Sequence, residues 1–464
     1  MVLDLISKKE EQIKPFGTSD KIGYGLGDFG CAVFFAFVSN YLMLFYTDVL
    51  GISAAAVGTL FVVARIWDAI NDPIMGSLPD RWMIGKSGNK FKPWIKIFMI
   101  PLALSGVLCF SKVPFEGVSL HAWVAFVYVL YGMSYTGTSM PFGAMASVVS
   151  TDPIDRSKLS RARSLGGTFV GIAALSFVPV VCFDSESNII PERFTLLAVI
   201  FGILSVVCYC LLLHLTTERV REEKKQNTEK FNYGNVLKAV VKNRPLIGVM
   251  VATIGSMLYI TGSNQIRSYV FKEYYGNTSA MTLLSLASVP IIIICFPLVP
   301  KLVAKFGKKT TLMFGVISST VLSVIIFAVK IPNVYVYSVL NVLAMIGQTV
   351  FTMLIWALVT DCLDYSEWKF HERSDGSMYS LYTFSRKIGS TIASAGVSFG
   401  LQAIGYISGN NVVQSDATIN NIYMLVALIP VLTCVLELIG IGAIFNLDKE
   451  QTKEMYAELK QRRE

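Results

Sequence analysis

The residues of this chain that could do chemistry are concentrated in one charged stretch inside an apolar segment. In VVARIWDAINDPIMG (62–76), Arg65, Asp68 and Asp72 are spaced i, i+3 and i+7, so on a helix they share one face, with Asn71 beside them. A charge at the bilayer centre costs at least about 2.5–3.5 kcal/mol, so such side chains face a cavity or a partner. Two carboxylates one turn apart repel in a low dielectric, so we expect either a proton on one of them or a cation between them.

A Na⁺-sized ion between Asp68 and Asp72 would need further oxygen ligands. Asn71 and a hydroxyl from a neighbouring helix are the candidates. The alternative is a fixed salt bridge between Arg65 and an aspartate that only holds helices together. The pattern favours the ion site for the two acids and the salt bridge for Arg65.

Other polar side chains inside apolar segments point to the same cavity. They are Asp28 and Asn40; Thr136, Thr138 and Ser139; Arg163; Asn264, Gln265 and Arg267; and Arg386 and Lys387. At least one of Arg386 and Lys387 should meet the acid pair, because both lie too far from the flanking polar loop to reach it easily. Several aromatic rings offer faces for a sugar, although packing or interfacial anchoring is favoured for each alone: Tyr24, Tyr135, Trp67, Trp356 and Tyr382.

The elements that position these residues are membrane-spanning helices. The 464 residues are 53% hydrophobic and 16% charged, whereas a soluble domain is about 45–50% apolar and about 25% charged. A span needs about 20 mostly apolar residues, and backbone groups in hydrocarbon must pair internally, which makes the spans helices. Twelve segments qualify: 22–49, 51–78, 95–112, 121–149, 164–183, 194–216, 246–272, 280–300, 310–330, 333–360, 378–406 and 420–446. The sequence predicts an all-α membrane protein of twelve transmembrane helices.

The basic residues predict the topology. Lysine and arginine gather in the loops after the even-numbered spans, which places both termini in the cytoplasm of a multi-pass protein of the cell (inner) membrane. The longest polar stretch divides the spans into two pseudo-symmetric six-helix bundles, as in the major facilitator fold. The expected parts are a tail (1–21), a first bundle (22–216), a central cytoplasmic loop (217–245), a second bundle (246–446) and a C-terminal tail (447–464).

Composition also excludes other classes. The net charge of +8 is spread over alternate loops and is not a nucleic-acid-binding patch. The eight cysteines show no metal-type spacing, and no nucleophile–base or phosphate-loop motif points to an enzyme. We expect no cofactor apart from a coupling ion, Na⁺ or H⁺.

The chain resembles the glycoside–pentoside–hexuronide:cation symporters, a family of the major facilitator superfamily whose best-known member is melibiose permease. The resemblance is carried by GYGLGDFG (23–30), FYTDVLGI (45–52), GTLFVVARIWDAINDPIMG (58–76), GNKFKPWI (88–95), MSYTGTSMPFGAMASVVSTD (133–152) and DCLDYSEWKF (361–370). These runs lie in both halves, and ARIWDAINDP is the most specific of them.

The resemblance implies roles for particular residues. It implies a cation site made of Asp68, Asn71, Asp72 and Thr136, which agrees with a cage of hard oxygen ligands and favours Na⁺, with Li⁺ and H⁺ left open. It also implies that Lys387 links the sugar and cation sites and that Arg163 belongs to the sugar pocket. A cytoplasmic charged gate is implied at Arg156, Asp361, Asp364 and Arg373.

Departures from the family pattern bear on the sugar. Two carboxylates that bind galactoside hydroxyls in melibiose permease are replaced by Ala32 and Ser139, a lysine by Cys31, and a stacking tryptophan by Gly143. A pocket that loses two acids suits an anionic hexuronide such as a β-glucuronide, because arginine binds carboxylates well. A neutral pentoside such as a xyloside is equally open if the acid pair occupies Lys387. The candidate substrate-binding residues are Arg163, Lys387, Ser139, Asp28, Tyr135 and Tyr382.

The sequence therefore predicts a secondary active symporter that takes up a glycoside together with Na⁺ or H⁺ by alternating access. Its expected partners are the glycoside, a monovalent cation and the lipid bilayer, and no nucleic acid. The alternatives are a cation symporter of lysolipids or other amphiphiles, which needs a cleft open to lipid, and a transport-inactive sensor, which would be supported by an extra soluble domain.

Overall fold

The described part of the chain is almost wholly helical. The computed structural model describes residues 14–82, 84, 88–150, 152–184, 186–219, 243–370, 375–409 and 412–463. Within these ranges the one departure from helix, turn and loop is an isolated β-bridge between Phe183 and Ile189. The predicted all-α fold class is confirmed.

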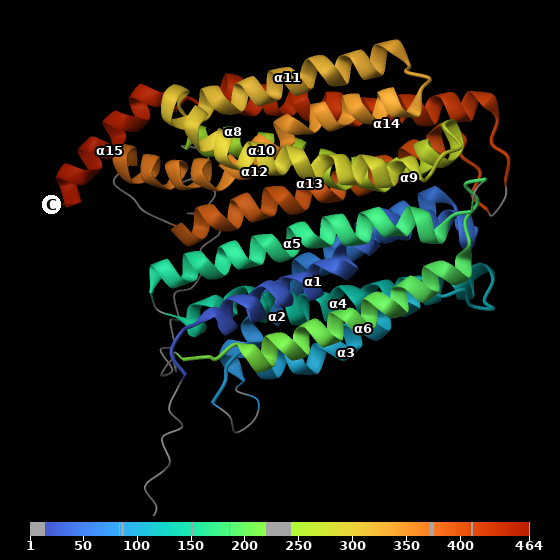
Figure 1. The fold of residues 1–464 in the computed structure, drawn as a ribbon, viewed down its shortest axis with the longest axis horizontal. Helices are drawn as coiled ribbons and strands as arrows, with labels where there is room; N and C mark the ends of the chain where they lie inside the picture. The colour runs from blue at the N-terminus through green and yellow to red at the C-terminus, as the bar shows by residue number, and fades with distance from the viewer. Residues whose placement is uncertain are drawn as a thin grey trace, which may run out of the picture. The chain divides into compact units, whose positions relative to one another are not determined.

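Six helices make up the first half of the sequence (Figure 1). They are α1 (Thr18–Leu44), which continues as the π-helical η1 (Phe45–Val49), then α2 (Ala54–Arg81), α3 (Lys92–Cys109), α4 (Gly117–Val149), α5 (Pro153–Cys182) and α6 (Pro191–Leu215).

The second half also contains six long helical segments. The first runs without a break from Arg244 to Tyr274 as α8 (Arg244–Met257), η2 (Leu258–Ser263), α9 (Asn264–Tyr269) and η3 (Val270–Tyr274). The others are α10 (Ala280–Phe306), α11 (Lys308–Val329), α12 (Val334–Phe370), α13 (Asp375–Ala403) and α14 (Asp416–Glu437) with η4 (Leu438–Ile444). A final helix, α15 (Lys449–Arg463), forms in the predicted C-terminal tail and packs against α12 (Figure 1).

Each of the twelve predicted segments is helical. Among the described residues, ten helices are long and apolar enough to cross a membrane. The other two, α5 and α13, have 30 and 29 residues and are more polar, because they carry Arg163 and the pair Arg386–Lys387. The structure extends α5 and α12 well beyond the predicted boundaries, because an apolar run marks only the part in hydrocarbon and a helix can continue into water.

The helices group into two compact units. The first contains Met1–Val38, Ile66–Ala174 and Glu192–Asn227, and the second contains Ser39–Arg65, Leu175–Pro191 and Thr228–Glu464. The units therefore do not follow the halves of the sequence everywhere, since α1, α2 and α5 contribute residues to both.

In the first unit, a close crossing of α1 and α5 depends on glycine. A Cβ added to Gly166 would collide with the carbonyl oxygen of Gly25. Asp28 and Arg163 lie three residues from these glycines on the same two helices, so the crossing brings an acid of α1 next to a base of α5. The beginning of α3 is anchored by Glu218, whose carboxylate accepts backbone hydrogen bonds from residues 90, 91 and 92 at 2.6, 3.1 and 2.8 Å.

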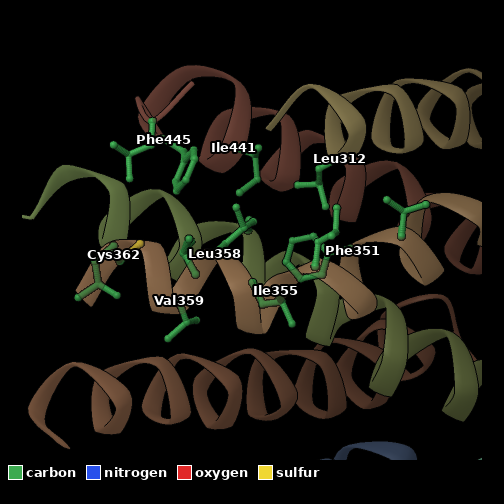
Figure 2. Packing of buried hydrophobic residues seen from close by; sticks show 14 of the residues in the cluster. Leu312, Phe351, Ile355, Leu358, Val359, Cys362, Ile441 and Phe445 are labelled. Atoms are coloured by element: carbon green, nitrogen blue, oxygen red, sulfur yellow. The ribbon is translucent and has the colours of Figure 1, made fainter. Parts of the chain in front are cut away.

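The second unit has a hydrophobic core around α12 (Figure 2). Phe351, Ile355 and Leu358 of α12 pack with Leu312 of α11 and with Ile441 at the end of α14, and all are buried. Lipid tails are as apolar as these side chains, so removing the side chains from lipid stabilises the helix contacts little. Close packing between the side chains holds these helices together instead. The beginning of α8 is fixed to this core by the Asn243 side chain, which accepts from the Leu246 N–H and donates to the Cys362 carbonyl.

Candidate functional site

The acid pair of α2 faces α4 in the first unit. The hydroxyl of Thr136 donates to Asp72 Oδ1 at 3.0 Å. One turn earlier on α4, a Cβ added to Gly132 would lie 3.3 Å from Asp68 Oδ1. Since Asp68 and Asp72 are also one turn apart, the two carboxylates lie along the same strip of α4.

Asn71 completes the candidate cation site. Its side chain is only 4% exposed, and its Nδ2 atom is buried without a hydrogen-bond partner. Together with Asp68, Asp72 and Thr136 it offers carboxylate, amide and hydroxyl oxygens, which are ligands that suit a hard monovalent cation. Within the described residues no group of three or more His, Cys, Asp or Glu could hold a metal ion. A cation at this position would be held by mixed oxygen ligands.

Asp28 and Arg163 form an ion pair in the same unit. Arg163 Nε donates to Asp28 Oδ1 at 2.8 Å, and the guanidinium lies 5.2 Å from the centre of the Phe142 ring. Glycine on the adjoining helices leaves room for both groups, because a Cβ on Gly167 would lie 3.1 Å from Asp28 Oδ2 and one on Gly143 would lie 3.8 Å from Arg163 Nη1. The pair has no net charge, and it places hydrogen-bond donors and acceptors side by side.

Two further sequence candidates lie on α4. Tyr135 is half-buried, and its ring stacks on Phe35 of α1 at 5.5 Å and on Tyr131 at 6.2 Å. Ser139, one turn further along, is also partly exposed. One turn beyond Ser139, the Phe142 ring lies 5.2 Å from the Arg163 guanidinium, which places this part of α4 beside the Asp28–Arg163 pair.

Two other candidates belong to the second unit. Lys387 is half-buried on α13, and its approach to the acid pair stays a prediction. Tyr382, also on α13, is 3% exposed and lies in the hydrophobic core with Leu358. This environment indicates that Tyr382 packs in the core and does not face a substrate.

The acids of the predicted cytoplasmic gate have local partners. Asp361 of α12 accepts from Lys308 Nζ at 2.7 and 2.8 Å and from the Tyr456 hydroxyl of α15 at 2.5 Å. Burial and this hydrogen bond raise the pKa of Tyr456, so its hydroxyl remains a donor at neutral pH. Asp364 is buried one turn further along α12. The side chain of Arg156 and the whole of Arg373 lie outside the described residues.

Sequence reasoning missed a buried charged cluster at the end of η1. Asp48 pairs with Lys272 at 2.5 Å, and Lys272 also lies 2.9 Å from Glu273. Asp48 entered the sequence analysis only as part of the FYTDVLGI run, and Lys272 is the last residue of a predicted span. The one available signal was a lysine and an aspartate at span ends on the same predicted side of the membrane.

These features define a class of protein. A chain of spanning helices with a half-buried acid pair, a candidate cation site rich in oxygen ligands and a neutral Asp–Arg pair has the parts of a multi-pass secondary transporter. The family model described as MFS/sugar transport protein matches residues 23–449, and the chain belongs to this family. It is a sugar-type transporter of the major facilitator fold and not an enzyme.

Similar proteins agree with this assignment. The chain is 32% identical over 461 residues to a Bacillus subtilis (strain 168) symporter named YjmB, covering 97% of each chain. It is 31% identical to the isoprimeverose transporter of Lactiplantibacillus pentosus (96% of this chain and 91% of the other), and 28% identical to the glucuronide carrier protein homolog of Escherichia coli (strain K12), covering 95% of each. The crystal structure of a D-xylose-proton symporter matches the fold with a TM-score of 0.60 at 16% identity, covering 94% of this chain and 97% of the other.

Proposed function

We propose that this protein takes up a neutral glycoside, a pentoside such as a xyloside first among them, together with Na⁺ or H⁺. The observation that carries the choice of sugar is the ion pair between Asp28 and Arg163. From the sequence alone, an anionic hexuronide and a neutral pentoside were equally open. With Asp28 at 2.8 Å the arginine is neutralised, and a substrate carboxylate would meet a carboxylate of the protein.

A paired aspartate and arginine suit sugar hydroxyls. The carboxylate accepts from one hydroxyl and the guanidinium donates to its neighbour, so a diol satisfies both groups at once. The similarity to an isoprimeverose transporter supports a pentoside, and the similarity to a glucuronide carrier homolog keeps a hexuronide as the alternative outcome of the test.

The coupling ion binds at the acid pair in this proposal. An incoming cation neutralises Asp68 and Asp72 and is also held by the Thr136 hydroxyl and the Asn71 amide oxygen. Lys387 is then released from the acids to support the bound glycoside. Each ligand favours the other because each removes an uncompensated charge, and such coupling is typically about 1–3 kcal/mol and reciprocal. The loaded protein then opens to the cytoplasm, with both termini on the cytoplasmic side of the cell (inner) membrane.

The test is uptake by proteoliposomes across a panel of neutral and anionic glycosides, with Na⁺ and H⁺ gradients imposed separately. In Asp72→Asn we expect gradient-driven accumulation to fall about tenfold or more, since losing about 1.4 kcal/mol of ion binding is already a factor of ten. The control is Asp152→Asn, which removes an exposed carboxylate outside the spans. Normal accumulation by folded Asp72→Asn would refute the ion site, and uptake of glucuronides alone would refute the neutral sugar.

A further inference from the structure

A second group of ionisable side chains lies in the second unit. This outer cluster joins η1 to the end of α9 and to the segment after α13. Its members are Thr47, Asp48, Tyr269, Lys272, Glu273 and Tyr406. By the predicted topology it lies on the extracellular side, at the ends opposite the basic loops.

The hydrogen bonds of the outer cluster converge on Asp48. Its Oδ1 atom accepts from the Thr47 hydroxyl at 2.7 Å and from the Tyr406 hydroxyl at 2.8 Å, and its Oδ2 atom accepts from Lys272 Nζ at 2.5 Å. These three donors, one of them the Lys272 ammonium, satisfy both oxygen atoms of the Asp48 carboxylate. Asp48 and Lys272 therefore form a neutral, well-satisfied pair.

The Glu273 carboxylate is less well satisfied by hydrogen bonds than the Asp48 carboxylate. Its side chain is 10% exposed, and its Oε1 atom lies 2.9 Å from Lys272 Nζ but accepts no well-directed hydrogen bond there. The ammonium is already shared with Asp48, whose side chain is fully buried. If both acids were ionised, the outer cluster would hold two negative charges against one positive charge in a dry environment.

Such an excess charge is costly, and neighbouring groups do not offset it. A buried unpaired carboxylate costs several kcal/mol, and the ordinary response is to take up a proton. The charged groups that act on Glu273 are Lys272 and Asp48. In the described part of the chain, the elements packed around η3 contribute phenols here: Tyr269 from α9, Tyr406 from after α13, which also interacts with Glu273, and Tyr423 from α14.

We propose that the outer cluster is a proton-binding site, and that Glu273 carries one proton when the outer ends of these helices are packed as in this structure. The carboxylate takes the proton from the extracellular water and becomes a neutral acid, while Asp48 and Lys272 remain a charged pair. Two observations point to this ligand: the nine-tenths buried Glu273 carboxyl, whose Oε1 atom accepts no well-directed hydrogen bond, and the two-to-one count of acids over bases in the outer cluster.

The site deepens the proposed function and rests on it for its role. In a transport cycle, η1 must part from η3 and from Tyr406 to admit sugar from outside. Water then reaches Glu273, which ionises and releases its proton. Because the proton binds the closed arrangement more tightly, acid outside should hold the outer end closed, and alkali should favour opening. One proton can change this equilibrium by at most about tenfold per pH unit.

Infrared spectroscopy of the purified protein at neutral pH tests the site without using transport. We expect Glu273→Gln to remove the carbonyl stretching band of one protonated carboxyl. The matched control is Glu116→Gln, an exposed glutamate before α4, which should leave this band unchanged. Other protonated carboxyls contribute equally to both spectra, so the readout is the difference between wild type and variant. A protonated-carboxyl band of the same intensity in Glu273→Gln as in the wild type overturns the proposal.

A second variant separates loss of the proton site from loss of folding. In Asp48→Asn the count becomes one acid and one base, so Glu273 should ionise against Lys272 and the same band should disappear. Persistence of the band in folded Asp48→Asn also counts against the proposal. Thermal melting of each variant reports whether it is folded.

Equilibrium exchange of sugar in proteoliposomes then tests the role in transport. With the internal pH fixed, wild-type exchange should slow several-fold as the external pH falls from 8 to 6, by up to about tenfold per unit. Exchange by Glu273→Gln should change less than about twofold over this range. Wild-type pH dependence in Glu273→Gln would remove the role in gating. Absence of sugar exchange in every protein, with the infrared result intact, would instead show that the proposed function is wrong.

Discussion

Replacing Asp28 by asparagine should reverse the substrate preference of the sugar site. The substitution keeps the shape of the side chain but removes the charge that lies 2.8 Å from Arg163. The Arg163 side chain is 45% exposed, so it can turn toward a bound ligand once its partner is neutral. We expect binding of a glucuronide to strengthen and binding of the matching neutral glucoside or xyloside to weaken.

The size of the change follows from Coulomb's law. A substrate carboxylate at Arg163 would lie on the order of 5 Å from Asp28, where two unit charges interact by about 3 kcal/mol at an effective dielectric of 20 and by about 0.8 kcal/mol in water. Since this pair is partly exposed, we take the lower part of that range, about 1–2 kcal/mol. Removing the repulsion should therefore improve glucuronide binding by about 5- to 30-fold.

The assay is competition against a radiolabelled neutral glycoside, measured with purified protein at saturating Na⁺ and at two salt concentrations. Asp155→Asn is the matched control, because Asp155 also pairs with a base of α5, Lys158, at 2.9 Å. The control should leave both affinities unchanged. An equal loss of affinity for the neutral and the anionic sugar in Asp28→Asn would refute the reasoning, since it would show that Asp28 acts through folding or through a hydroxyl contact alone.

Two further predictions concern the framework of the site. Gly166→Ala should force α1 and α5 apart and lower the free energy of unfolding by about 1–3 kcal/mol. Gly396→Ala is the control, because its Cβ would meet no described atom within 4 Å. Thermal melting compares the two variants, and equal melting temperatures would show that the crossing is loose. Asp361→Asn should leave Lys308 without its carboxylate and cost about 1–3 kcal/mol, checked by urea or thermal unfolding in detergent; unchanged stability would mean that water compensates the lysine.

The fold could be predicted from the sequence because one property, the length of apolar runs, decides it. Twelve runs gave twelve helical segments, and the ends were missed where polar residues continue a helix outside hydrocarbon, as at the beginning of α5 and the end of α12. The shared helix face of Asp68 and Asp72 could also be predicted, since helical spacing places both acids on one face whatever surrounds them.

The pairing of charges could not be predicted, because it depends on contacts between distant segments. Asp28 and Arg163 are 135 residues apart in sequence; both were expected to bind substrate, but nothing in the sequence indicated that they pair with each other. Asp48 and Lys272 are 224 residues apart and meet because the end of α1 groups with the second unit. Lys308, the partner of Asp361, was counted only as part of a basic loop.

The helix α4 offers a physical route for coupling inside the first unit. Thr136 touches Asp72 of α2, whereas the adjacent Tyr135 stacks on Phe35 of α1, beside the Asp28–Arg163 pair. Adjacent residues on a helix project about 100° apart, so one rigid segment presents a face to each site. When a cation draws the Thr136 hydroxyl away from Asp72, any rotation of α4 that follows must also move the Tyr135 ring. In the proposed function, ion binding therefore reshapes the proposed sugar site through a single turn of helix, in addition to any charge that Lys387 contributes.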